Sequence, residues 1–85
     1  LFLAASAMSA ARGFSTHSME CADAKRAMLA LAEQVIVLAD SAKAQRSAFL
    51  SFASLQDADV IITDTDVPPE FLRAAKASGV QVICT

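Results

Sequence analysis

Two hydrophobic runs of the sequence each end in an aspartate that polar turn residues follow. The runs cover residues 35–40 and 60–64, and their aspartates are Asp40 and Asp64. In an open parallel sheet, residues at the carboxyl ends of the strands border a crevice in which small ligands bind. Aspartates at such positions are also common in turns, because the carboxylate accepts hydrogen bonds from the following backbone. The pattern therefore predicts either a ligand site or capped turns at this edge.

The elements that must position these aspartates follow from the hydrophobic pattern. Short, mostly apolar runs are typical of parallel strands covered by helices on either side, and they occur at residues 1–4, 35–39, 60–63 and 80–84. Helices are predicted between them at 20–33 and 69–78. Residues 48–55 fit a short strand or a helical turn, and residues 41–47 a loop. This alternation predicts an α/β domain, with a layered parallel sheet flanked by helices.

The two predicted helices carry start and stop signals and one apolar face each. Ser18 is a candidate N-cap of the first helix, and Pro68 and Pro69 open the second, where prolines are favoured. Gly79 follows the second helix, at a position that prefers a residue tolerant of positive φ. Apolar residues at helical spacing predict the faces that pack on the sheet: Cys21, Ala24, Met28, Leu31 and Ala32 in the first helix, and Phe71, Leu72 and Ala75 in the second.

Composition excludes several kinds of site. The 85 residues carry 7 Lys and Arg against 9 Asp and Glu, a formal charge of -2, whereas a nucleic-acid-binding face needs clustered basic residues. The chain has a single histidine, His17, which we place in an exposed loop, and two separate cysteines, Cys21 and Cys84. These residues form no zinc-binding set, so we expect no metal and no cofactor.

The apolar opening, residues 1–11, lacks a preceding basic region and is too short to span a bilayer. We therefore read it as a buried strand and a loop, and expect no membrane contact.

The ends of the sequence indicate a fragment of a longer protein. The chain begins with Leu1 rather than methionine and stops on the strand-like residues 80–85. A chain of 85 residues holds one small core and buries a modest fraction of its surface. We therefore expect it to associate with itself or with further protein.

Several motifs of the chain resemble the effector-binding domain of DeoR-type bacterial transcriptional repressors. The most specific are Leu-Ala-Asp-Ser-Ala-Lys, ending at Lys43, and Ile-Thr-Asp, ending at Asp64, followed by Pro-Pro-Glu-Phe-Leu and Gly-Val-Gln-Val-Ile. The resemblance covers nearly the whole chain. It implies a fold related to the ribose-phosphate isomerase and CoA-transferase group. It also implies that residues 1–85 are the carboxyl-terminal half of a sugar-phosphate-binding sensor, with a winged helix-turn-helix and the first half of the sensor lying elsewhere.

The resemblance implies effector-binding roles for four residues. Asp40 and Lys43 correspond to the aspartate and lysine of the family's effector pocket, where a carboxylate can accept bonds from sugar hydroxyls and an ammonium group can meet a phosphate. Glu20 matches an acidic position at the start of the family's helix, and a favourable interaction with the helix dipole is the alternative. Ser6 stands where relatives usually carry an aspartate, and its hydroxyl can still bind a sugar. Asp64 matches a second strand-end aspartate, for which we expect a structural turn role.

The function that the resemblance implies is effector sensing in a DNA-binding regulator of sugar metabolism. Its partners would be a phosphorylated sugar, operator DNA bound through a domain outside these residues, and further copies of the protein, because repressors usually pair on two-fold operators. The expected location is the cytoplasm.

Two other classes compete with the regulator. A sugar-phosphate isomerase would need a positioned base and a group that stabilises the oxyanion, and the acidic residues that such isomerases place after the strand matching residues 1–4 are missing. A receiver-like domain would need an acidic cluster and a lysine, of which Asp40 and Asp64 supply only part. We therefore expect no enzyme activity.

Overall fold

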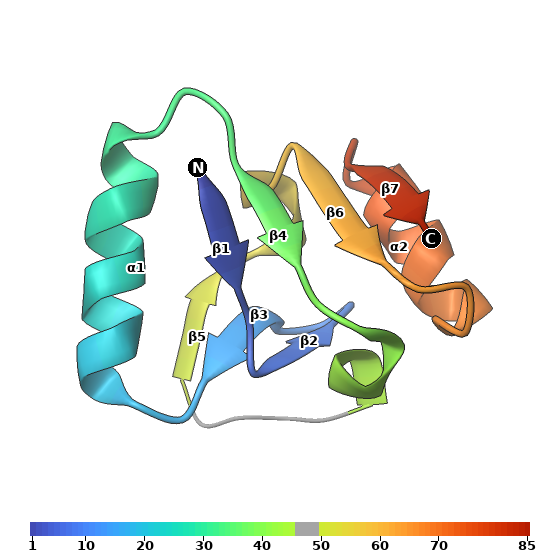
Figure 1. Ribbon diagram of the computed structural model, residues 1–85, viewed down its shortest axis with the longest axis horizontal. Helices are drawn as coiled ribbons and strands as arrows, with labels where there is room; N and C mark the ends of the chain where they lie inside the picture. Colours follow the sequence, from blue (N-terminus) through green and yellow to red (C-terminus); the bar gives the residue numbers. More distant parts are fainter. Residues whose placement is uncertain (46–49) are drawn as a thin grey trace.

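The computed structural model describes residues 1–45 and 50–85, and its main feature is a parallel sheet (Figure 1). This sheet has four strands in the order β1-β4-β6-β7, with bounds Phe2–Ala4, Ile36–Leu38, Val60–Thr63 and Gln81–Cys84. The register places Leu3 beside Val37, Val37 beside Ile61 and Ile61 beside Val82. The predicted parallel strands and α/β fold class are thus confirmed.

A second, antiparallel sheet lies beside the carboxyl ends of the first, and the sequence did not predict it. Its three strands, in the order β2-β3-β5, are Ala7–Ser9, Gly13–Thr16 and Leu50–Ala53. The strand alternative for residues 48–55 is confirmed at β5, while residues 48 and 49 lie outside the described residues. The rest of this sheet was missed because β2 and β3 are three or four residues long and buried on both faces, so no alternation marks them.

The helices begin and end close to the predicted positions. They are α1 (Met19–Leu31) and α2 (Pro69–Ala77), with short 3-10 helices η1 (Ser41–Gln45) and η2 (Leu55–Asp57). Cys21 N donates to the Ser18 hydroxyl at 3.2 Å, which confirms the N-cap, and Gly79 has φ +80° after α2. Part of the predicted loop 41–47 is therefore η1, and its last two residues lie outside the described part. No helix in the described residues is long and apolar enough to cross a membrane.

The predicted packing face of α1 is wrong. Leu31 is 88% exposed and Met28 43% exposed, whereas Ala22 is fully buried and Leu29 packs against the core. Alanines occur on several sides of this helix, so its polar and apolar sides differ little. The prediction therefore followed the large apolar residues, which lie on the exposed side. The helix packs against β3 and β5 rather than against the parallel sheet. On this side of the helix, the Lys25 Nζ lies 5.0 Å from the centroid of the Phe52 ring of β5.

The parallel sheet is covered on one face only. Leu3, Val37 and Ile61 of that face are buried in the core, and α2, with Phe71 and Ala75 buried, packs against β7. A parallel sheet flanked by helices is confirmed, and within the described residues the helices lie on this one face and leave the opposite face uncovered. The physical reason is the strand order: it follows the chain order, so right-handed connections all lie on the same face.

Candidate functional site

The carboxyl ends of β1, β4 and β6 gather the candidate residues of the sequence at one edge. The three strands are neighbours and parallel, so the segments that leave them start side by side. Ser6 follows β1, Asp40 and η1 follow β4, and Asp64 follows β6. In Figure 1 this is the edge to which the arrowheads of these strands point, with η1 as the short coil after β4.

The Asp64 carboxylate joins the turns that follow two strands. One oxygen, Oδ2, accepts a hydrogen bond from Ser41 N at 2.9 Å, and Oδ1 accepts one from Asp66 N at 2.9 Å. Hydrogen bonds from the Ser41 backbone and side chain, and then from the Asp66 backbone, lower the pKa of Asp64 from its usual 3.8. The expected structural turn role of Asp64 is confirmed, and Ser41 is the partner that the sequence did not reveal.

The Asp40 carboxylate accepts no such hydrogen bonds from the described residues. Its turn is closed by the main chain, because Lys43 N donates to the Asp40 carbonyl oxygen at 3.0 Å. The Asp40 side chain is exposed and the Lys43 side chain half-buried, and neither forms a hydrogen bond or an ion pair with another described residue. The turn-capping alternative therefore has no bond to support it at Asp40. Both charged groups are available to a ligand.

Ser6 lies at the same edge, and Glu20 does not. Ser6 is half-buried between β1 and β2, with its N–H bonded to the Ser15 carbonyl at 3.1 Å, and η1 packs against β2. Glu20 is exposed in the first turn of α1, which Figure 1 shows on the opposite side of the antiparallel sheet from η1. Its position suits the helix dipole. His17 is exposed between β3 and α1, as expected.

Thr63 adds a polar group that no pattern of the sequence singles out. Its hydroxyl is buried at the end of β6 and has no hydrogen-bond partner among the described residues. A threonine in an apolar run reads as a strand former, so only the three-dimensional surroundings reveal the unpaired oxygen. It lies one residue before Asp64, at the same edge as the other candidates.

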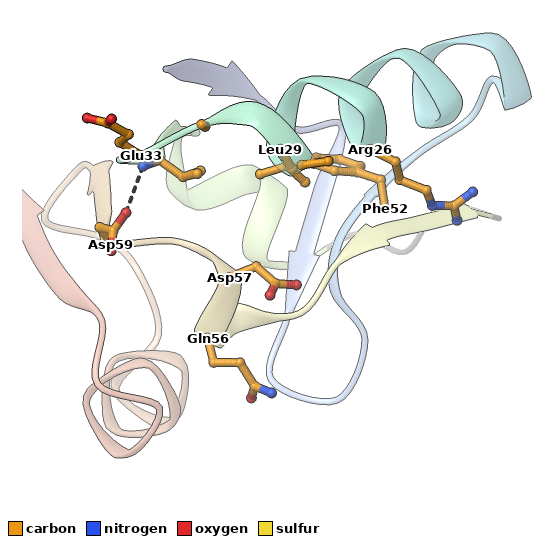
Figure 2. Close-up of a pocket in the computed structure, with 10 residues that line it drawn as sticks. Arg26, Leu29, Glu33, Phe52, Gln56, Asp57 and Asp59 are labelled. Carbon is orange, nitrogen blue, oxygen red and sulfur yellow. Dashed lines mark hydrogen bonds between the residues drawn. The ribbon is translucent and has the colours of Figure 1, made fainter.

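A surface hollow of about 510 Å³ lies at the opposite end of the sheet (Figure 2). Its lining includes Val35 and Asp59, which precede β4 and β6, together with Leu29 and Phe52. Its aspartates are engaged: Asp59 Oδ2 accepts a bond from Val35 N at 2.7 Å, the dashed line in Figure 2, and Asp57 accepts bonds from the backbone and hydroxyl of one serine. We therefore place the candidate site at the carboxyl edge, where ligands of open parallel sheets bind.

Comparison with known families matches most of this chain to one family model. The sequence model of the family described as DeoR C terminal sensor domain matches residues 1–65. This range contains β1, β4, β6 and all the candidate residues described above.

Curated relatives are similar over nearly the whole chain. A protein named "Putative aga operon transcriptional repressor" from Escherichia coli O157:H7 is 39% identical over 83 residues, which are 98% of this chain and 31% of that protein. The HTH-type transcriptional regulator GlpR of Haloferax volcanii is 32% identical over 98% of this chain and 32% of its own length. The HTH-type transcriptional regulator UlaR of Escherichia coli is 32% identical over 86% of this chain and 29% of its own length. The chain thus spans about a third of the length of these relatives.

Proposed function

Because this chain belongs to the DeoR C-terminal sensor domain family, we propose that it is the effector-sensing part of a transcriptional regulator and binds a phosphorylated sugar. The relatives are named as transcriptional regulators or repressors, which supports a regulatory role rather than a catalytic one. We further propose that residues 1–85 are one half of the sensor, within a cytoplasmic protein of about the relatives' length.

The observation that carries this proposal is the pair of uncommitted charges after β4. A carboxylate and an ammonium group leave one short turn, Asp40 to Lys43, while the turn itself is held by the main chain and by Asp64. The rigid turn would present Asp40 to sugar hydroxyls and Lys43 to a phosphate. Ser6, after the neighbouring strand, would supply a neutral donor and acceptor to the sugar.

The charge of the chain supports DNA contact through another part of the regulator. A formal charge of -2 disfavours a phosphate-binding face for DNA, which needs clustered Lys and Arg. The turn after β1 carries Ala5 and Ser6 and no carboxylate, so the acid-base chemistry of an isomerase has no group there. These features favour a sensor that modulates DNA binding by another part of the protein.

Lys43→Ala tests the phosphate contact in the full-length regulator. Removing a charged hydrogen bond costs about 1.5–3 kcal/mol, so sugar-phosphate affinity should fall about 10- to 150-fold. The thermal midpoint should hardly change, because the Lys43 side chain bonds no described residue. Isothermal titration against a panel of sugar phosphates, beside Lys76→Ala on the exposed side of α2 as control, measures this. Equal losses in the two variants, or none in either, would remove Lys43 from the site.

Asp40→Asn tests the sugar contact separately. The variant should bind the same sugar phosphate more weakly, by about tenfold or more, yet still bind operator DNA with wild-type affinity. The control is Asp66→Asn, whose carboxylate is exposed and accepts no hydrogen bond from a described residue. Operator binding measured with and without the effector reads out both functions. Turnover of a sugar phosphate by the wild-type protein would instead make it an enzyme.

A further inference from the structure

One side of helix α1 is apolar and lies in water. It consists of Cys21, Ala24, Met28 and Leu31, which we call the α1 seam, and all four residues are exposed. Leu31 is 88% exposed and Met28 43%. These are four of the residues that the hydrophobic pattern predicts to pack on the sheet. Figure 1 shows α1 at one side of the molecule, with no described element on its outer side. A continuous apolar strip of this kind marks a contact surface.

The domain uses a different side of the same helix. Ala22 is buried and Leu29 packs against the core, on the side where α1 contacts β3 and β5. With 3.6 residues per turn, the middle of the α1 seam lies about 130° around the helix from these two residues. Helices bury their apolar sides against other elements, so α1 has one side that is packed and a second side that requires a partner.

The spacing of the α1 seam is that of a helix that packs lengthwise on another helix. Its residues recur after three, four and three positions, which is the a and d pattern of a coiled coil. The 13 residues of α1 form a helix about 20 Å long, and the seam follows most of that length. A second helix at a small crossing angle can contact all four residues. The partner is therefore a helix.

The order of side-chain sizes along the α1 seam indicates a second copy of the same helix. The small residues Cys21 and Ala24 come first, and the large residues Met28 and Leu31 follow. In an antiparallel pair related by a two-fold axis, Leu31 of one protomer opposes Cys21 of the other, and Met28 opposes Ala24. Each layer then combines one large and one small side chain, which fills the space evenly. A parallel pair would put two alanines in one layer and leave a gap there.

The charges of α1 are compatible with this pairing. The α1 seam itself has no charged residue. Asp23 and Arg26 form an ion pair at 3.5 Å, away from the seam, and Lys25 is directed to the domain, where its ammonium donates to the Ala4 carbonyl oxygen. Glu20 is next to the seam at the start of the helix, where it would remain in water. Pairing two seams therefore buries no unpaired charge, which would oppose association.

We propose that two copies of the protein associate by antiparallel packing of their α1 helices along the α1 seam. The two-fold axis makes the contact self-complementary and closed, so it gives a dimer and not a filament. The inference goes beyond the proposed function, because neither Asp40 nor Lys43 belongs to the contact and no effector is needed for it.

Disulfide crosslinking tests the pairing in the full-length protein encoded by the gene. Every cysteine except Cys21 is first replaced by serine, and Leu31→Cys is then added to this parent. The antiparallel pair holds the new thiol beside Cys21 of the other protomer at high effective concentration, so mild oxidation should form covalent dimer about tenfold faster or more than in the parent. Ala30→Cys, exposed on another side of α1, is the matched control and should react no faster than the parent. Because Leu31 is 88% exposed, the substitution should leave the thermal midpoint unchanged.

Removing Cys21 checks the register. Leu31→Cys combined with Cys21→Ser should lose the covalent dimer, because residue 31 of the two protomers lies at opposite ends of an antiparallel pair. Three results would overturn the proposal. Fast crosslinking of the parent itself would indicate a parallel pair, and equal rates for Leu31→Cys and Ala30→Cys would indicate random collision. No covalent dimer with Leu31→Cys would mean that something other than a second α1 covers the seam.

Discussion

Asp40 and Asp64 follow neighbouring strands, yet their carboxylates differ in the hydrogen bonds that they accept. Asp64 accepts two backbone N–H groups and ties the turn after β6 to the start of η1, whereas Asp40 closes its turn with a carbonyl oxygen. The sequence cannot separate them, because the Ser41 N–H that engages Asp64 lies 23 positions away. Local patterns predict that an aspartate ends a strand, but the partner of its side chain depends on strand order.

Asp64→Asn should therefore destabilise the fold in a pH-dependent way. The folded-state pKa of Asp64 is lowered, so its stabilisation is complete well above 3.8 and is lost as pH falls through the lower folded-state pKa. Urea unfolding at pH 7 should show the variant less stable than the wild type, and the difference should shrink toward pH 3. Asp66→Asn is the control. A difference that stays constant with pH would mean that the charge of Asp64 contributes nothing.

At the scale of elements, continuous apolar runs predicted strands correctly, whereas short or weakly patterned segments did not reveal their secondary structure or their buried face. The strands around Val37 and Ile61 were predictable because unbroken apolar runs are typical of parallel strands, even though the described residues cover one face of their sheet only. The β2-β3-β5 sheet and the inward face of α1 were not, since both depend on small residues such as Ala7 and Ala22, whose burial is decided by what packs on them. The candidate residues Ser6, Asp40 and Lys43 follow predictable strands, so their place at the carboxyl edge was predictable as well. The hydrogen-bond partner of Asp64 became known only from the structure.

Gly13 is a position where the antiparallel sheet needs glycine, and Gly79 is its matched control. Both have positive φ, +72° and +80°, but a Cβ at Gly13 would clash with the Ala53 carbonyl oxygen and lie 2.7 Å from Ser54 Cα, whereas Gly79 has nothing within 4 Å. Gly79→Ala should cost roughly 1–2 kcal/mol, the penalty for left-handed backbone. Gly13→Ala should cost more, because β3 and β5 must also move apart. Equal free energies of unfolding for the two variants would show that this close approach does not exist.

At the scale of the whole molecule, one core joins the two sheets and ends at the uncovered face of the parallel sheet, on which Phe2, Leu38 and Ile83 are exposed. The buried cluster runs from Leu3 and Phe14 to Val80, so the carboxyl edge with Asp40 rests on a packed interior. Large apolar side chains stay exposed on this uncovered face and on the outer side of α1. Such surfaces usually mark contact with more protein, which agrees with a chain that spans about a third of its relatives.

The 85-residue chain should therefore self-associate when it is produced alone. In the isolated chain, the uncovered face of the parallel sheet and the outer edge of β1 remain in water, and burying this apolar surface between copies is favourable at about 25 cal/mol per Å². Sedimentation velocity should show species larger than 8.9 kDa. Leu38→Lys, which puts a charge on the uncovered face, should shift the distribution toward monomer, whereas Ala77→Lys on the exposed side of α2 should not. A wild-type chain that stays monomeric at all concentrations, with a cooperative melt, would show that the uncovered face is stable in water and would contradict this prediction.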